Sequence, residues 1–395
     1  MVNAQLQVAV DIGSRRHRVA VGDVGGELFE EFDVEHTAAG LSDFFARVEH
    51  WQAKLGWPVA VAMEGFNGWA RPLDRQVLAH GWRLYSVNNL KLARYKEIFP
   101  GPAKSDAIDT RAMLELFRLR AQLRVARDVL QEVGATPVEN DKLKRLTRRR
   151  RQLVNEKTRV QNRMQADLQA LCPGLLSITA QADNLWFLSL LSCREDIRKL
   201  ASVRKSTLLC LDGVGRKYAS LIQAWQPQAL FSDEAQWAGP MIVSDAPRLL
   251  ALKGEIDTLE ASIAQIAQDS ELARRIQSVP GFGVTCSSEL AGEIATLDRF
   301  HSEASLALYL GMAILEHSSG KHSGAKPPRQ VNARAKAAMM TAAARHLENV
   351  PASRVYYDKK RAQGKTHNQA VRALGRQLVR VIWSMLKHAR DYELR

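Results

Sequence analysis

The first 125 residues alternate between short apolar runs and polar or glycine-containing breaks, a pattern typical of strands that alternate with helices. The apolar runs predict strands at residues 5–11, 18–24, 27–34, 58–63 and 82–87. Apolar positions three and four residues apart predict helices at about 39–55, near 69–80 and from 106 onward. The predicted order, β-β-β-α-β-α-β-α, makes this part of the chain an α/β domain.

From residue 139 the apolar positions follow a heptad-like spacing, which is typical of long packed helices. The first seam consists of Leu143, Leu146, Leu153, Val160, Met164, Leu168 and Leu171, and the second of Leu249, Leu252, Ile256, Leu259, Ile263 and Ile266. Two such seams predict either an antiparallel hairpin within the chain or a contact with another subunit. The segment between them, 175–245, is predicted to be helical and apolar.

These patterns divide the chain into three predicted domains. Residues 1–125 form the α/β domain, 126–274 a coiled-coil and helical linker or dimerisation region, and 275–395 a mostly α-helical domain. In the last domain a Pro-Gly-Phe-Gly turn between two helices predicts a helix-hairpin-helix-like element. Its glycines, Gly281 and Gly283, let backbone amides approach a phosphate closely, although a packing turn explains them nearly as well.

Acidic residues stand at the ends of two predicted strands and at the start of a helix. Asp11 follows the run QLQVAV, and Glu64 follows PVAVAM. Asp106 and Asp109 open the next long helix at a spacing that places them on one face. Four converging carboxylates repel each other unless a cation lies among them. Their hard oxygen atoms predict Mg²⁺, or Mn²⁺, as that cation.

The element order and the acid positions together are those of a ribonuclease-H-like (RuvC-like) fold. In that fold the first strand, a later strand and the last helix supply metal-binding acids. Any one of the acids is also explained as a strand-end or helix-capping residue, but their joint placement favours a site. The turn Asp11-Ile12-Gly13 is shared with actin-like ATPases and sugar kinases. Those proteins need a second such turn and a glycine-rich adenosine site, and this sequence contains neither.

The net charge of the chain indicates which kind of partner it binds. The 395 residues include 56 Lys and Arg against 42 Asp and Glu, a net charge of +14, which predicts nucleic acid or another anionic surface. No run of 18 apolar residues and no basic-apolar leader occurs, so we expect neither membrane insertion nor secretion. Four scattered cysteines predict reduced thiols in a cytoplasmic protein.

One stretch concentrates the positive charge. Between residues 142 and 163, ten Lys and Arg stand against one acid, Glu156. Ten like charges repel if left unpaired, so a polyanion is favoured over a merely solvated helix face. The residues at the centre of this stretch, all predicted to bind nucleic acid, are Arg148, Arg149, Arg150 and Arg151.

A loop at 317–324, HSSGKHSG, is rich in serine, glycine and lysine. Such a loop can place a hydroxyl beside a phosphate whose charge is held by nearby cations. A flexible basic loop is the alternative, and composition alone favours it. The remaining cations predicted to contact nucleic acid are Lys104, Lys321, Lys326 and Arg329.

Most of the chain resembles the DEDD transposases of the insertion-sequence one-ten (IS-one-ten) family, which are bridge-RNA-guided serine recombinases. The resemblance rests on five segments: VAVDIGS with Asp11, VAMEGF with Glu64, KSDAID with Asp106 and Asp109, PGFG, and GMAILEHSSGK. The Lys-Ser-Asp-x-x-Asp element is weak by itself. Its combination with a Ser-Gly-Lys far downstream makes the resemblance specific.

The resemblance implies a metal-dependent strand exchange. It implies that the four acids hold Mg²⁺ and that a serine directly before a glycine is the nucleophile, which matches Ser319, with Ser318 as its neighbour. It also implies a phosphoserine intermediate, target and donor DNA as substrates, and a bridge RNA that pairs with both. The implied assembly is a dimer or a dimer of dimers in the bacterial cytoplasm, associated with the nucleoid.

Two other classes remain open beside the ATPase. In a RuvC-type nuclease the acids suffice, water attacks the phosphate, and Ser319 is an ordinary residue. A basic RNA-binding scaffold with a decayed site is the other, and the four acids argue against it.

Overall fold

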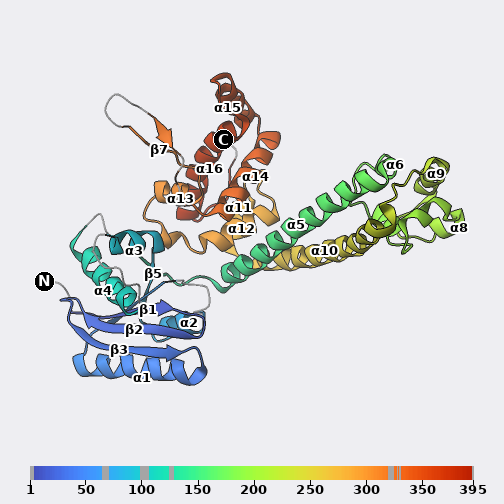
Figure 1. Ribbon diagram of the computed structural model, residues 1–395. Helices are drawn as coiled ribbons and strands as arrows, with labels where there is room; N and C mark the ends of the chain where they lie inside the picture. The colour runs from blue at the N-terminus through green and yellow to red at the C-terminus, as the bar shows by residue number, and fades with distance from the viewer. Residues whose placement is uncertain are drawn as a thin grey trace. The chain divides into compact units, whose positions relative to one another are not determined.

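Six strands of the N-terminal part form one mixed sheet in the computed structural model (Figure 1). Along the sheet they lie in the order β3-β2-β1-β4-β5-β6. Their bounds are β1 Leu6–Ile12, β2 Arg16–Asp23, β3 Leu28–Glu35, β4 Val59–Met63, β5 Arg83–Val87 and β6 Leu130–Glu132. Strands β1, β4 and β5 run parallel, whereas β2, β3 and β6 pair antiparallel with their neighbours. The five predicted strands are confirmed. Strand β6 was not predicted, because three residues are too few to show an alternation of apolar and polar positions.

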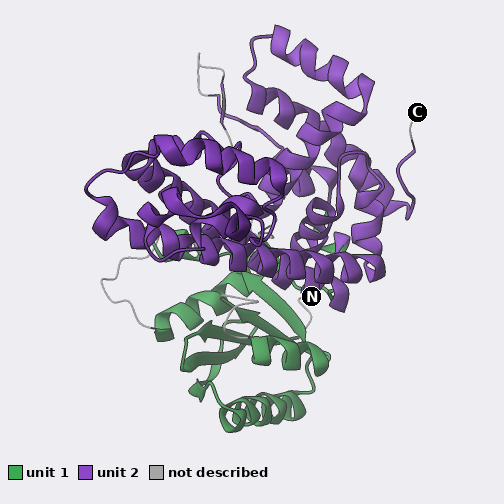
Figure 2. Ribbon diagram, turned by 90° about the vertical axis from the view of Figure 1, so that its right-hand side faces the viewer, with its two compact units in different colours: residues 1–136, 298–301 green, residues 137–297, 302–395 purple. Residues whose placement is uncertain are grey.

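The structure describes residues 4–64, 71–97, 106–123, 129–318, 324–326, 328 and 331–393. The chain divides into two units, residues 1–136 with 298–301 and residues 137–297 with 302–395 (Figure 2). The coiled-coil region and the C-terminal helices belong to the same unit.

Four helices cover the two faces of the sheet. Their bounds are α1 Ala38–Leu55, α2 Arg71–Ala79, α3 Asn89–Lys96 and α4 Asp106–Gln122. Side chains alternate along β1, so Val8 and Val10 lie in one core cluster with α1 while Ala9 lies in another with α4. The α4 face of the sheet is lined by alanines of β1, β2 and β4, whose small side chains let α4 lie close to the strands.

Helix α3 lies in a segment for which the apolar pattern of the sequence predicts no helix. The side chain of Asn88 accepts a hydrogen bond from the backbone amide of Lys91 at 3.2 Å and caps the helix. The eight residues of α3 span about two turns, too few for apolar periodicity to identify a helix. Residues 98–105, including Lys104, lie outside the described ranges.

The second unit is built on two long helices, α5 Val138–Leu171 and α10 Ala235–Asp269. Arg150 pairs with Glu260 near one end of the hairpin, and Glu156 pairs with Arg248 farther along, so the helices run antiparallel. The predicted seams meet within the chain: Leu153 and Val160 are each only 2% exposed. Of the two alternatives, the intrachain hairpin is therefore confirmed.

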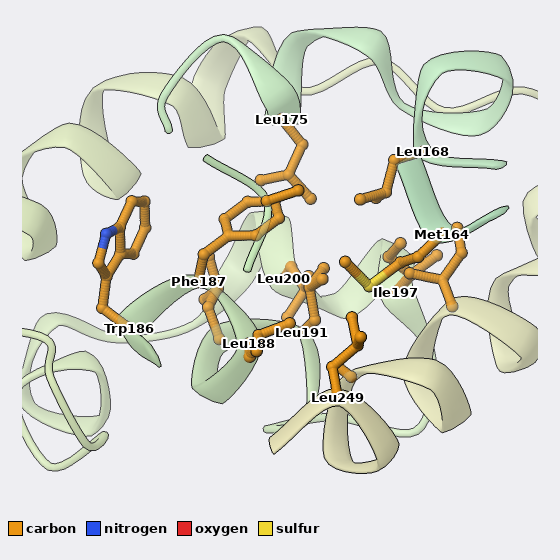
Figure 3. Packing of buried hydrophobic residues seen from close by; sticks show 14 of the residues in the cluster. Met164, Leu168, Leu175, Trp186, Phe187, Leu188, Leu191, Ile197, Leu200 and Leu249 are labelled. Atoms are coloured by element: carbon orange, nitrogen blue, oxygen red, sulfur yellow. The ribbon is translucent and has the colours of Figure 1, made fainter. Parts of the chain in front are cut away.

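The insert between these helices is helical and apolar, as predicted. It contains α6 Pro173–Leu176, α7 Leu185–Leu191, η2 Ile197–Ser202, α8 Lys205–Leu208, α9 Arg216–Trp225 and η3 Gln226–Gln228. Phe187 and Leu188 of α7 pack in one cluster with Met164 of α5 and Leu249 of α10 (Figure 3). The insert thus shares its core with the long hairpin.

The C-terminal part is mostly α-helical, as predicted. Its elements are α11 Glu271–Gln277, α12 Val284–Ile294, η4 Leu297–Arg299, α13 Glu303–Tyr309, β7 Leu315–Glu316, β8 Ala325–Lys326, α14 Ala333–Asn349, α15 Pro351–Ala362 and α16 His367–Lys387. The longest of the last three helices, α16, begins with a capping box between Thr366 and Gln369. Within the described ranges, no helix is both long enough and apolar enough to cross a membrane.

Candidate functional site

The parallel pairing of β1 with β4 brings two of the predicted acids to one edge of the sheet. Val10 lies opposite Met63 in the register, and the amide of Glu64 donates to the carbonyl oxygen of Val10 at 3.3 Å. Asp11 is the next residue of β1, so its carboxylate and that of Glu64 leave the ends of adjacent strands. This placement follows from the strands being parallel, because their carboxyl ends then share an edge.

The first turn of α4 supplies the other two acids. Asp109 is 7% exposed, whereas Asp106 is exposed. The buried Thr110 donates its hydroxyl to the carbonyl oxygens of Asp106 and Ala107, which holds this turn in place. Acids at this end are also favoured by the positive end of the helix dipole.

The four acids lie close enough to act on one another electrostatically. The pKa of Asp11 is raised from the ordinary 3.8 to about 6. Burial is the largest cause, and the negative charges of Glu64, Asp106 and Asp109 add to it. Among the residues that the structure describes, only Lys96 opposes the shift. The structure therefore brings the four predicted acids into one neighbourhood, where this lysine is the single described cation that offsets them.

Lys96, the last residue of α3, was missed by the sequence analysis. Its Nζ lies 2.8 Å from Oδ1 of Asp109, and its side chain is 29% exposed. No signal in the sequence indicated this role, because the apolar pattern predicted no helix at this position and a lysine outside a helix has no defined direction. In the structure the ammonium group of this lysine partly offsets the negative charge of the acid cluster.

The donor set of the cluster fits a hard divalent cation. Carboxylate oxygens are the ligands that Mg²⁺ or Mn²⁺ prefers, and the raised pKa of Asp11 reflects burial first and then the repulsion that such an ion removes. Among the residues that the structure describes, no three His, Cys, Asp or Glu side chains are arranged to hold one ion. The acids thus share a neighbourhood without forming a coordination sphere.

The shifted pKa of Asp11 leads to a prediction on stability. Above about pH 6 the carboxylate is ionised in both folded and unfolded chains, and the folded state is destabilised by its burial and by the repulsion of the other acids. Below 3.8 it is protonated in both. We expect Asp11→Asn to stabilise the metal-free protein at pH 7.5, on the order of 1 kcal/mol after allowance for solvent screening. The gain should shrink as pH falls from 6 to 3.8. Thermal melting in EDTA at several pH values measures it, and an equal gain at every pH would contradict this cause.

The predicted nucleophile loop is only partly described. Strands β7 and β8 pair antiparallel, and the His317 amide donates to the carbonyl oxygen of Gly324 at 2.8 Å. Ser318 is exposed, and its hydroxyl donates to Oε1 of Glu316 at 3.3 Å. Lys326 is exposed on β8. Ser319, Lys321 and Arg329 lie outside the described residues, so their predicted roles stay predictions.

The central arginines of α5 have acidic partners within the chain. Arg148 donates to Glu293 of α12 at 2.7 and 2.9 Å, and Arg151 donates to Glu289 at 2.8 and 2.6 Å. The side chain of Glu293 is fully buried. Burial acts to raise the pKa of Glu293, but the hydrogen bonds from Arg148 and Asn332 outweigh it, and the pKa lies below its ordinary value.

The neighbouring cations follow the same pattern. Arg150 donates to Glu260 at 2.6 Å, and a nitrogen of Arg149 lies 3.9 Å from a carboxylate oxygen of Glu255. Lys157 and Arg163 pair with acids of other segments, Asp183 and Asp245. At least six of the ten cations in 142–163 are thus paired, so the premise that this charge is left unpaired is wrong. The acids that pair with them lie 26 to 145 residues away, which no local charge count detects.

These contacts predict unequal roles for adjacent arginines. Arg148→Gln should lower the free energy of unfolding by about 3 kcal/mol, because Glu293 stays buried without its charged partner. Arg149→Gln is the matched control, and we expect a change within about 0.5 kcal/mol because its pair is long and exposed. Urea denaturation of both variants measures these free energies of unfolding. Equal losses would mean that the pairing with Glu293 contributes nothing specific.

The Pro-Gly-Phe-Gly turn packs against α14. Gly281 has φ +85°, and a Cβ there would lie 2.5 Å from the backbone nitrogen of His346. Nδ1 of His346 lies 2.6 Å from the carbonyl oxygen of Pro280. The packing alternative therefore explains Gly281. Gly283 precedes α12, is exposed and has open space around it.

Both halves of the chain match models of transposases. Residues 8–173 match a model described as a transposase, and residues 273–358 match a model described as a transposase of the IS116/IS110/IS902 family. Together the two matches cover well over half of the chain, so the protein is an insertion-sequence transposase. It belongs to the IS116/IS110/IS902 family, in agreement with the resemblance to the IS-one-ten transposases noted in the sequence.

Relatives of similar length support this assignment. The chain is 29% identical over 324 residues to the uncharacterized 43.6 kDa protein of insertion element IS110 from Streptomyces coelicolor, a match that covers 80% of this chain and 78% of that protein. It is 26% identical to the IS116 protein of Streptomyces clavuligerus, covering 98% and 96% of the two chains. It is 28% identical to the IS900 protein of Mycobacterium paratuberculosis, covering 96% and 94%.

Proposed function

We propose that this transposase cuts and rejoins DNA strands with the acid cluster and Ser319. The observation that carries the proposal is the convergence of four carboxylates from β1, β4 and α4, expressed in the raised pKa of Asp11. A purely structural role would not explain why four acids lie together in a partly buried place, where like charges repel each other.

The sheet supports a ribonuclease-H-like (RuvC-like) assignment of the first unit. The order β3-β2-β1-β4-β5, with β2 antiparallel to β1 and β4 parallel to it, is the one that the element order predicts for such a fold. We also retain the helix-hairpin-helix-like assignment of α11, the turn and α12 as part of the proposal.

The acids Asp11, Glu64, Asp106 and Asp109 would hold Mg²⁺ or Mn²⁺. When bound, the ion stabilises charge on the scissile phosphate. The chain's own part is to place the carboxylates at one edge and to keep Asp109 buried beside Lys96. Asp11 must lose its proton to act as a ligand, so binding should strengthen as pH rises through about 6.

Ser319 supplies the group that attacks. Its Oγ forms a bond to phosphorus, the bond from phosphorus to the leaving DNA oxygen breaks, and the hydroxyl proton ends on that oxygen. The phosphoserine ester keeps the bond energy, so attack by a second DNA end restores a phosphodiester and frees the serine without ATP. A serine hydroxyl is a weak nucleophile and needs activation, which the cations Lys321, Lys326 and Arg329 support by holding the charge of the phosphate.

Partners follow from the family resemblance. We propose target and donor DNA as substrates, a bridge RNA that pairs with both, and a dimer or a dimer of dimers in the bacterial cytoplasm, associated with the nucleoid. Because the seams of α5 and α10 are buried in the chain, an oligomer must use other surfaces. Of the four α5 arginines, Arg149 is the most available for contact with nucleic acid, because its side chain is 58% exposed.

A second candidate is a RuvC-type nuclease in which water attacks. It is favoured by the acid cluster alone, which suffices for hydrolysis. Both candidates are tested by one reconstitution with purified protein, Mg²⁺, the RNA transcribed beside the gene, and DNA that carries the element junction and a target. We expect recombinant junctions that require every component and disappear in EDTA. Cut ends without junctions would favour the nuclease.

A further inference from the structure

The positive charge of α15 and α16 is not balanced within the chain. Residues 351–387, here termed the basic hairpin, carry nine Lys and Arg and one acid, a net charge of +8 out of +14 for the whole chain. The nine cations are Arg354, Lys359, Lys360, Arg361, Lys365, Arg372, Arg376, Arg380 and Lys387. Among the residues that the structure describes, acids pair with only two of them, Arg354 with Asp358 and Arg376 with Glu303. In this respect the basic hairpin differs from α5, whose cations are mostly paired with acids.

Three of these cations share a face of α16. Arg372, Arg376 and Arg380 follow one another at intervals of four residues. Arg376 pairs with Glu303, whereas Arg372 and Arg380 pair with no acid among the residues that the structure describes. Nε of Arg372 is also buried without a hydrogen-bond partner. A polyanion bound along this face supplies the negative charge that Arg372 and Arg380 lack.

The aromatic residues of α15 indicate which nucleic acid fits. Tyr356 and Tyr357 are half-buried, with Nζ of Lys360 5.4 Å from the first ring centre and Cζ of Arg354 5.7 Å from the second. Oη of Tyr357 lies 2.8 Å from Nδ1 of His367 at the start of α16. Both rings are engaged with cations, and Tyr357 also contacts α16, an arrangement that differs from the open stacking platform that single-stranded nucleic acid requires.

We propose that the basic hairpin binds the phosphate backbone of duplex DNA without reading its sequence (Figure 1). The exposed cations Lys359, Arg361 and Arg380 contact phosphates and release counterions. The inference rests on the proposed function, since it assumes that DNA is the substrate. It assigns the contact to a surface that neither the acid cluster nor the serine loop includes.

The test compares two triple variants of the full-length protein. Lys359→Gln, Arg361→Gln and Arg380→Gln are combined in one, and the control combines Lys205→Gln, Arg216→Gln and Lys217→Gln, three exposed cations of the helical insert. Affinity for a DNA duplex of unrelated sequence is measured between about 50 and 200 mM salt. We expect the hairpin variant to bind at least about tenfold more weakly at the low-salt end. Its slope of log affinity against log salt should be flatter by about 1 to 3 units. The control should keep the parent's values.

The outcomes separate this inference from the proposed function. A parent protein that binds no duplex at any salt would count against DNA processing as a whole. A parent that binds, with a hairpin variant indistinguishable from it, would overturn the basic hairpin alone. A variant that keeps duplex DNA affinity but loses affinity for a structured RNA would also overturn it, and would assign the surface to RNA. Circular dichroism and melting of both variants confirm that they are folded.

Discussion

Replacing any one of the four acids by its amide is expected to abolish DNA strand exchange while the fold persists. The variants are Asp11→Asn, Glu64→Gln, Asp106→Asn and Asp109→Asn, and we expect each to lose about a thousandfold or more in rate. The reason is that each removes a charged ligand from a site where a metal ion supplies several kcal/mol of charge stabilisation. Removing one of four like charges relieves repulsion at the cluster, and melting of each variant checks that it is folded, above all for Asp109→Asn, which also loses the ion pair with Lys96.

The control for these variants is Asp43→Asn. Asp43 lies on α1 of the same unit, its side chain is 51% exposed, and it pairs with Arg47 on the surface. We expect full strand exchange from it. Mg²⁺ should raise the melting temperature of the parent and the control, and much less that of the four amide variants. If all four amide variants keep the parent's activity, this edge of the sheet is not the catalytic centre.

Ser319→Ala is expected to eliminate the covalent protein–DNA adduct while binding of DNA and RNA persists. The assay uses a suicide substrate nicked near the exchange point, on which the adduct accumulates and is seen on denaturing gels. The adduct should be lost entirely, since alanine has no oxygen to form the ester. Ser319→Cys should keep at most a trace, because a thiolate attacks phosphorus poorly.

Ser318→Ala and Ser323→Ala are the internal controls for this experiment. Both neighbours lie in the same loop sequence, and Ser318 is exposed with its hydroxyl directed to Glu316. Each should lose much less adduct than Ser319→Ala. An adduct that survives Ser319→Ala and vanishes with Ser318→Ala would move the nucleophile by one residue. Free DNA ends with no adduct from the unmutated protein, given Mg²⁺ and the RNA, would make water the attacker.

Features that depend on local order could be predicted from the sequence. The apolar runs identified five strands of the sheet, because alternation along a strand is visible within a few residues. The two seams identified α5 and α10, and the strand-end positions of Asp11 and Glu64 followed from the same pattern. Their approach in space was expected from the joint placement of the acids, and the pKa of Asp11 agrees with it. The structure adds the reason, because β1 and β4 pair parallel and end at one edge.

Features that depend on distant partners were decided only by the tertiary structure. The sequence around Arg148 shows an excess of positive charge, and only folding brings Glu293 to it across 145 residues. The role of Lys96 likewise depends on α3, a helix too short to predict. Lys96 is the last residue of this helix, and its ammonium group contacts Asp109. Gly281 was consistent with phosphate contact or packing until the backbone of α14 was seen beside it. A charge or a glycine has the same local signature whether its partner is a ligand or another part of the chain. Sequence alone therefore determined the longer elements and the acids at their ends, while long-range contacts decided which charges remain for a partner.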